Sequence, residues 1–206
     1  MGFDIEGIIK TAGYIGLFLI VFAETGLLVG FFLPGDTLLL SAGLLIQQNK
    51  VGLELWILIP LLIVAAVLGD AVGYQVGKHT GPRIFKQEDS RLFHKDHLIR
   101  AQKFYDRHGG KTIIIARFLA FIRTFAPTVA GAAKMPYPKF ASYNIVGAVL
   151  WVPSLTLVGY FFGKAIPANS IDVFFIGLVV VMVAASTAPA LIHLWRERRK
   201  AGRAAA

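Results

Sequence analysis

Two long stretches of the chain are apolar without interruption. Residues 140–163 contain no charged side chain over 24 positions, and residues 173–195 contain none over 23 when His193 is counted as neutral. A helix needs about 20 predominantly apolar residues to cross a bilayer. A third stretch, residues 53–76, carries charge only at Glu54 and Asp70. The pattern therefore predicts transmembrane helices in these three places.

Charged residues divide the other apolar parts of the chain into short pieces. These pieces are 5 to 13 residues long and cover residues 11–23, 25–35, 37–49, 112–116 and 118–122. Such lengths suit broken or re-entrant helices better than independent spans. We expect the helix breaks at Pro34 and Gly35 in the first half and at Pro127 and Gly131 in the second.

The basic residues predict how the chain crosses the membrane. Nine of the 21 Lys and Arg residues lie within 78–111, and five more lie within 196–203. Cytoplasmic loops are enriched in these residues, so we place both segments in the cytoplasm. Residues 112–138 then begin and end on the cytoplasmic side, and residues 31–50, which follow a first helix at 11–28, begin and end on the outer side. Two re-entrant hairpins enter from opposite faces, and both termini are cytoplasmic.

A short internal similarity agrees with this topology. Glu24 precedes Pro34 by ten residues, and Arg117 precedes Pro127 by ten. The segment PGDTLLLSAG after the first break is similar to the shorter PTVAG after the second. Two hairpins of opposite orientation form an inverted repeat, and such repeats with broken helices place binding sites near the bilayer midplane.

The sequence thus predicts one all-α membrane domain, residues 1–206, with about four transmembrane helices, two oppositely oriented re-entrant helical hairpins and a cytoplasmic amphipathic helix. The expected segments are a first half (11–76, hairpin 31–50), a basic amphipathic segment (77–111), a second half (112–163, hairpin 112–138), a last transmembrane helix (171–195) and a basic cytoplasmic tail (196–206).

Composition supports a membrane protein. The chain is 56% hydrophobic and 16% charged, whereas soluble domains carry about 25% charged residues. The net charge of +9 is concentrated beside apolar segments, so it predicts contact with anionic lipid headgroups rather than with nucleic acid. The absence of cysteine excludes disulfides and thiol catalysis.

Five ionisable residues lie within or at the ends of apolar segments: Glu24, Asp36, Asp70, Arg117 and Arg123. Charges at such depth are costly and suggest function. One interpretation is that they form buried ion pairs that only hold the hairpins in place. The functional interpretation is a polar cavity in which the two arginines bind an anionic headgroup, because a guanidinium matches phosphate oxygens.

The acidic residues fit a second role in that cavity. A buried carboxylate can exchange a proton near neutral pH, so Glu24 and Asp36 are candidates for proton coupling. Asp70 is equally well explained as a packing partner of a Lys or Arg. The four-residue spacing of Gly69, Gly73 and Gly77 predicts close helix packing.

Enzyme and metal motifs are absent from the sequence. It contains no GxSxG, HExxH or GxxxxGK[ST] pattern. His94 and His97 are three residues apart, but they lie in the basic segment without a convincing set of carboxylates. We therefore expect no catalytic residue, no metal and no cofactor.

Three segments of the chain resemble the DedA family of membrane proteins, also called the SNARE-associated or VTT-domain family. They are FAETGLLVGFFLPGDTLLLSAG (22–43), GDAVGYQVGKHTGPRIF (69–85) and GGKTIIIARFLAFIRTFAPTVAGAAKMPYPKFASYNIVGAVLW (109–151), and the resemblance covers about residues 14–163. Many members have Pro where this chain has Ala120, and the family allows either acid at Asp36.

This resemblance implies opposed re-entrant hairpins and lipid handling. It implies that the functional acids and arginines are Glu24, Asp36, Arg117 and Arg123. For a bacterial member it implies proton-driven return of undecaprenyl phosphate across the cytoplasmic membrane, with an anionic lipid and membrane lipids as partners. A phospholipid scramblase, a proton-coupled carrier of a small ion and a non-transporting membrane scaffold are the alternatives, and a homo-oligomer is compatible with each.

Overall fold

The structure is a computed structural model that describes residues 5–27, 35–84 and 110–165. Within these ranges the chain contains helices and no strand. The helices are α1 (Ile5–Gly26), α2 (Gly35–Gln47), α3 (Leu55–Ile84), α5 (Lys111–Ala116), α6 (Ala120–Ala132) and α7 (Tyr137–Ala165). The expected all-α class is therefore confirmed for this part of the chain. The predicted helix at 171–195, the tail at 196–206 and Pro34 lie outside the described residues.

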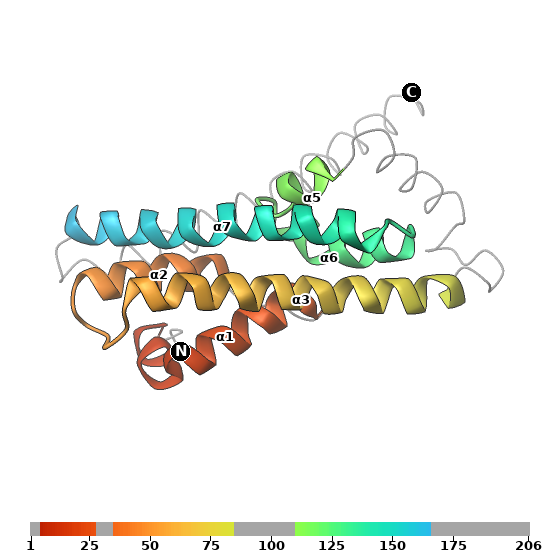
Figure 1. Cartoon of the computed structure of the whole chain (residues 1–206). Helices are drawn as coiled ribbons and strands as arrows, with labels where there is room; N and C mark the ends of the chain where they lie inside the picture. The colour runs from red at the N-terminus through yellow and green to blue at the C-terminus, as the bar shows by residue number, and fades with distance from the viewer. Residues whose placement is uncertain (1–4, 28–34, 85–109, 166–206) are drawn as a thin grey trace, which may run out of the picture. The chain divides into compact units, whose positions relative to one another are not determined.

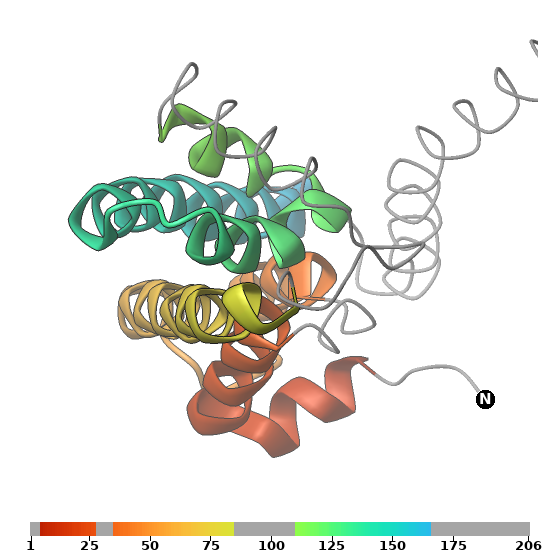
Figure 2. The same ribbon diagram turned by 90° about the vertical axis from the view of Figure 1, so that its right-hand side faces the viewer.

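The two longest helices, α3 and α7, lie side by side in opposite directions (Figure 1). The two 13-residue helices pack against them in a crossed manner, because α2 from the first half contacts α7 and α6 from the second half contacts α3. In Figure 1, α2 and α6 lie toward opposite ends of the α3–α7 pair, and Figure 2 shows α1 on the α3 side.

Glycines allow close approach at both crossed contacts, and they do so in the same pattern. Where α2 meets α7, a Cβ added at Gly43 would lie 2.0 Å from the carbonyl oxygen of Thr156, and one added at Gly159 would lie 1.9 Å from that of Leu40. The two backbones therefore touch directly, as in other helix pairs joined through small residues.

The contact between α3 and α6 repeats these distances. A Cβ at Gly131 would lie 2.0 Å from the carbonyl oxygen of Tyr74, and one at Gly77 would lie 1.9 Å from that of Thr128. Gly131 is 88 residues after Gly43, whereas the spacing of the prolines predicted a repeat of 93 residues from Pro34 to Pro127. The repeated contact pattern thus has a different register from the predicted one.

The distribution of side chains is that of a membrane protein. Many outward-facing positions of the two long helices are large and apolar, including Trp56, Val64 and Leu68 on α3 and Val149 and Phe161 on α7. Five charged side chains instead point inward and are at most 15% exposed: Glu24, Asp36, Asp70, Arg117 and Arg123. Residues 55–81 and 137–164 are long and apolar enough to cross a membrane. They correspond to the predicted spans at 53–76 and 140–163.

Two predictions about helix boundaries are wrong: the end of α3 and the position of the helix break in the second half. The helix predicted to stop at Val76 continues to Ile84, because Gly77 and Gly81 pack against α6 rather than ending the helix. Pro127 and Gly131 lie inside α6, which is continuous from Ala120 to Ala132, so they are not the break. The interruption falls at residues 117–119, between α5 and α6.

The first half begins with a bent helix. Gly13 has φ 55° and ψ −155°, a conformation that favours glycine, and it divides α1 into two parts. Residues 13–26 form a short apolar helix that packs against α3. In α2 the helix begins at Gly35, which agrees with the predicted break at that residue.

Candidate functional site

Arg123, the fourth residue of α6, is paired with two carboxylates from the first half of the chain. Its Nη2 donates to Glu24 Oε1 at 2.7 Å and its Nη1 donates to Asp36 Oδ1 at 2.5 Å. The side chains of Arg123, Glu24 and Asp36 are 6%, 3% and 15% exposed. These three residues form the Arg123 cluster, and Asp36 is its most accessible member.

Arg117, which follows α5, is paired with one carboxylate and one amide. Its Nη2 donates to a carboxylate oxygen of Asp70 on α3 and to Asn144 Oδ1 on α7, the latter at 2.6 Å. The amide nitrogen of Asn144 donates to the carbonyl oxygen of Val67 at 3.1 Å, so the α3 backbone sets the orientation of this amide. Arg117, Asp70 and Asn144 form the Arg117 cluster, and all three are buried.

The indole of Trp151 on α7 connects the two clusters. The Cζ atom of Arg123 lies 4.6 Å from the ring centroid and that of Arg117 lies 5.8 Å from it. The indole Nε1 donates to Asp36 Oδ1 at 2.9 Å. A buried ring contacted by two guanidiniums stabilises both cations and holds them close to each other.

The site lies where the N-terminal ends of α2 and α6 meet. Asp36 is the second residue of α2, and it contacts Arg123 in the first turn of α6. A carboxylate is favourable at a helix N-terminus, whereas a cation there opposes the helix dipole. The two carboxylates that contact Arg123 offset this unfavourable position.

Three glycines bring α1 and α2 into the site. A Cβ added at Gly69 would lie 2.0 Å from Thr25 Oγ1, and one added at Gly26 would lie 2.8 Å from the carbonyl oxygen of Gly69. This approach places Glu24 against α3 and α6. A Cβ at Gly35 would lie 1.4 Å from Glu24 Oε2, so the carboxylate occupies the space beside the first residue of α2.

All four residues predicted for the site lie in one connected network. Glu24, Asp36 and Arg123 are in direct contact, and Arg117 is joined to them through Trp151. The sequence left the role of Asp70 open between packing and function, and the structure pairs this residue with Arg117.

Two members of the site were not predicted. Asn144 is an amide within an otherwise apolar span, a signal that could have been used. Trp151 is buried in the middle of α7, and an indole at the centre of the span predicted at 140–163 was a comparable signal.

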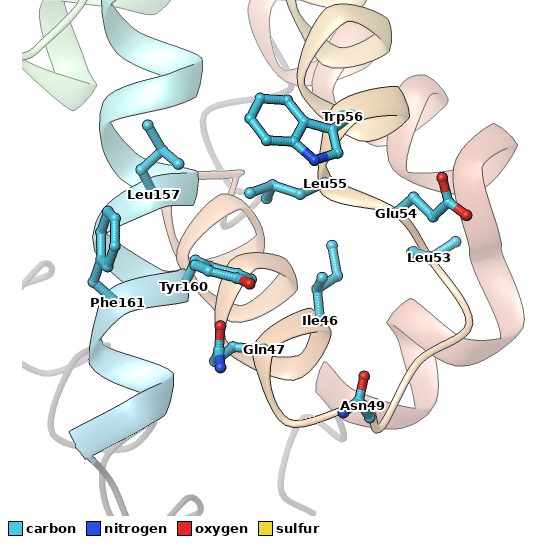
Figure 3. A pocket seen from close by; sticks show the side chains of 10 residues that line it. All are labelled: Ile46, Gln47, Asn49, Leu53, Glu54, Leu55, Trp56, Leu157, Tyr160 and Phe161. Carbon is cyan, nitrogen blue, oxygen red and sulfur yellow. The ribbon is translucent and has the colours of Figure 1, made fainter.

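A pocket of about 480 Å³ lies elsewhere, at the end of the α3–α7 pair where α3 begins and α7 approaches its end (Figure 3). Gln47, Trp56 and Tyr160 are among the residues that line it, and none of the ionic-site residues does. In the described part of the chain, no group of three or more His, Cys, Asp or Glu residues is arranged to hold a metal ion.

Together these features define a helical integral membrane protein with a buried ionic site at the N-terminal ends of two 13-residue helices, α2 and α6. The chain belongs to the VTT-domain family, the DedA family of membrane proteins: the VTT domain model matches residues 33–161.

Relatives of known name support the same assignment. The chain is 45% identical over 194 residues to Protein DedA of Escherichia coli (strain K12). The aligned region covers 93% of this chain and 86% of that protein. It is 36% identical over 190 residues to Inner membrane protein YqjA of the same organism, with 90% and 85% covered. An uncharacterized membrane protein of Mycobacterium leprae (strain TN) is 39% identical over 201 residues, with 97% and 87% covered. No solved structure matches the chain.

Proposed function

We propose that this protein moves an anionic lipid phosphate across the membrane and couples the movement to protons. The observation that carries the proposal is the contact of Arg117 and Arg123 with one buried ring, in a site that also holds three carboxylates. In this proposal the arginines bind the phosphate, and Glu24 and Asp36 exchange the protons.

The donors of the site favour an oxyanion as ligand. Arg117 Nη1 and Arg123 Nε are buried and make no hydrogen bond within the described residues. A guanidinium with an unused N–H group can donate to a phosphate oxygen, and the N-terminal ends of α2 and α6 add positive potential. Half-length helices that begin at a midplane site are a recurring way of binding anionic groups inside the membrane.

The charges of the site favour proton coupling. Three carboxylates against two guanidiniums leave one negative charge when all five groups are ionised. An anion would add to this excess at low dielectric, so its binding requires protons on the carboxylates. Glu24 and Asp36 share Arg123, and either one could release that arginine to the ligand after it takes up a proton.

The lengths of α2 and α6 fit two hairpins that enter from opposite faces. A 13-residue helix is about 20 Å long, which is less than the roughly 30 Å hydrocarbon core. Each would reach from one face to the middle of the membrane, where the ionic site lies. In this orientation both termini are cytoplasmic, and the protein lies in the bacterial cytoplasmic membrane.

The lipid that we expect from the family resemblance is undecaprenyl phosphate. The direct test is its translocation in proteoliposomes, with and without a proton gradient, by the wild type and by Arg117→Ala and Arg123→Ala. We expect each variant to be slower by roughly tenfold or more, because each loses a charge-assisted contact with the phosphate. Lys139→Ala, a change of an exposed cation at the start of α7, is the matched control and should transport at the wild-type rate. Wild-type rates in both arginine variants would refute the proposal.

A second measurement separates this proposal from the alternatives. Glu24→Gln removes a proton-exchanging group with almost no change in shape. If the protein is a scaffold, this variant should keep its cellular function. If the protein carries a small ion, proton-linked ion flux should occur in liposomes that contain no lipid phosphate.

A further inference from the structure

Asp70 is the one carboxylate of the site whose role the sequence left undecided and the proposed function does not use. It lies near the middle of α3 and is 3% exposed. Its contact with Arg117 involves a single guanidinium nitrogen, Nη2. A carboxylate and a guanidinium can instead form two parallel hydrogen bonds, and a pair that serves only to stabilise a fold gains from doing so.

The pair leaves one donor and one acceptor unused. Arg117 Nη1 and Asp70 Oδ1 are both buried without a hydrogen-bond partner in the described part of the chain. Leaving such groups unpaired costs about 1–3 kcal/mol each, and more when they are charged. This arrangement suits a contact that is exchanged for another more than one that is permanent.

The other ligand of Arg117 is held in place independently. Asn144 accepts from Arg117 Nη2 while its own amide nitrogen donates to the carbonyl oxygen of Val67. Asn144 can therefore keep its position when Asp70 loses its contact. It also carries no charge, so it competes with an anion for the guanidinium less strongly than a carboxylate does.

The charged groups around Asp70 come from the second half of the chain. Arg117, between α5 and α6, is its direct partner, and Arg123 on α6 also acts on it through the electrostatic field. The α7 residue that contacts the same guanidinium is the neutral Asn144. From α1, Glu24 reaches this network through Arg123, and Asp36 on α2 does the same.

The charge count then requires a second proton. The five ionised groups have a net charge of −1, and a ligand with a single negative charge makes it −2. Neutrality is restored by two protons. One of them fits the Glu24–Asp36 pair, because these carboxylates share Arg123, and the remaining carboxylate is Asp70.

We propose that Asp70 competes with the anion for Arg117 and takes up the second proton when the anion displaces it. This inference rests on anion binding at the arginines, as in the proposed function, but not on transport. The proton comes from solution and binds to a carboxylate oxygen of Asp70, while Arg117 donates to the anion instead. Asp70 is thus a positioning residue that acts through Arg117.

The test measures binding of dimethyl phosphate, a phosphodiester that keeps a single negative charge between mildly acidic and mildly alkaline pH. The purified full-length protein in detergent carries Trp56→Phe and Trp195→Phe, so that Trp151 reports on the site by its fluorescence. The slope of log Kd against pH gives the number of protons taken up with the anion.

We expect a slope approaching two protons in this background and a slope smaller by one after Asp70→Asn. We also expect Asp70→Asn to bind the phosphodiester roughly tenfold more tightly at mildly alkaline pH, because the competing charge is removed. Lys139→Ala should change neither value. A purely structural Asp70 predicts the opposite: an unchanged slope, with equal or weaker binding and a lower unfolding temperature, and that result would overturn the inference.

A second measurement keeps the inference testable if Asp70→Asn does not fold. Calorimetric titrations of the protein with native Asp70, in buffers of different ionisation enthalpy, count the protons bound with dimethyl phosphate directly. A value near two supports the inference and a value near one refutes it, as does a failure of the protein to bind this probe. Uptake of two protons with dimethyl phosphate, combined with no translocation of the lipid phosphate in proteoliposomes, would refute the proposed lipid transport. It would leave the role of Asp70 in place.

Discussion

The Arg123 cluster and the Arg117 cluster are each built around one arginine. The two arginines are six residues apart in sequence, but their surroundings differ. Arg123 contacts two carboxylates on α1 and α2, and one of them, Asp36, is partly accessible. Arg117 contacts one carboxylate and one amide on the two long helices, and both are almost fully buried. The Arg123 cluster thus carries the excess negative charge and the most exposed carboxylate, whereas the Arg117 cluster is balanced in charge and almost fully buried.

This difference suggests a division of work between two similar arginines. The Arg123 cluster is built from α1 and from the two 13-residue helices, α2 and α6. The Arg117 cluster is built on the long helices themselves. We therefore expect the first proton to bind at the Arg123 cluster and the second to bind only when the anion reaches Arg117.

The largest effect should follow from Arg123→Gln. This change leaves Glu24 and Asp36 close together and buried without their shared cation, and removing one member of a buried ion pair typically costs about 3–5 kcal/mol. We expect lipid translocation to be lost and thermal unfolding in detergent to occur at a clearly lower temperature. The additional change Glu24→Gln should restore part of the stability but not the transport. Unchanged stability in Arg123→Gln would show that the two carboxylates do not depend on this cation.

Arg117→Gln should be the next largest change, and it should be less destabilising than Arg123→Gln. Asp70 is the only carboxylate that loses its cation, Asn144 loses a neutral hydrogen bond, and the amide of the new Gln can still donate to one of them. Transport should nevertheless fall by roughly tenfold or more, because one of two phosphate ligands is missing. Unfolding temperatures and proteoliposome rates for both variants check the order. An equal loss of stability would contradict the proposed difference between the clusters.

Trp151 tests whether the two clusters act together. Trp151→Phe keeps an aromatic face for both guanidiniums but removes the hydrogen bond to Asp36, whereas Trp151→Leu removes both. We expect a loss of about 1–2 kcal/mol of stability for Phe and a larger loss for Leu. The Phe variant should mainly change the pH dependence of transport, because the altered contact is with Asp36. Identical behaviour of the two variants would show that the ring itself is unimportant.

The smallest effects should come from a matched pair of glycine changes. In Gly35→Ala the new Cβ would lie 1.4 Å from Glu24 Oε2, so the carboxylate must move away from its present position. In Gly147→Ala the new Cβ would lie 3.4 Å from Arg117 Cδ, which requires a shift of only a few tenths of an ångström. We expect a severalfold loss of transport in the first and nearly wild-type transport in the second. Similar losses in both would mean that the Arg123 cluster is no more sensitive than the Arg117 cluster.

The sequence was sufficient to predict the long helices and the charged residues of the site. Runs such as 140–163 can form little else in a membrane, because a helix satisfies every backbone hydrogen bond within the segment. The charges at Glu24, Asp36, Arg117 and Arg123 were recognisable because ionised groups at such depth are costly. The assignment to the family rested on the same segments, and the comparisons confirm it.

The sequence was insufficient where packing between distant helices decides the outcome. Pro127 was expected to break a helix, yet α6 continues through it while packing against α3. Gly77 was recognised as a packing residue, but the continuation of α3 beyond it depends on its contact with Thr128. Neither contact is visible in local spacing, because the partners lie about 50 residues apart in the chain.

By itself, the sequence determined that the protein lies in a lipid bilayer, that it is helical, and which ionisable groups its apolar segments contain. The tertiary structure decided which acid contacts which arginine, and it placed Asn144 and Trp151 among them. The physical reason is that hydrophobicity and charge cost are properties of single residues and short runs. Ion pairing is a property of positions that only close helix packing brings together, and here that packing depends on the close contacts at Gly26, Gly35 and Gly69.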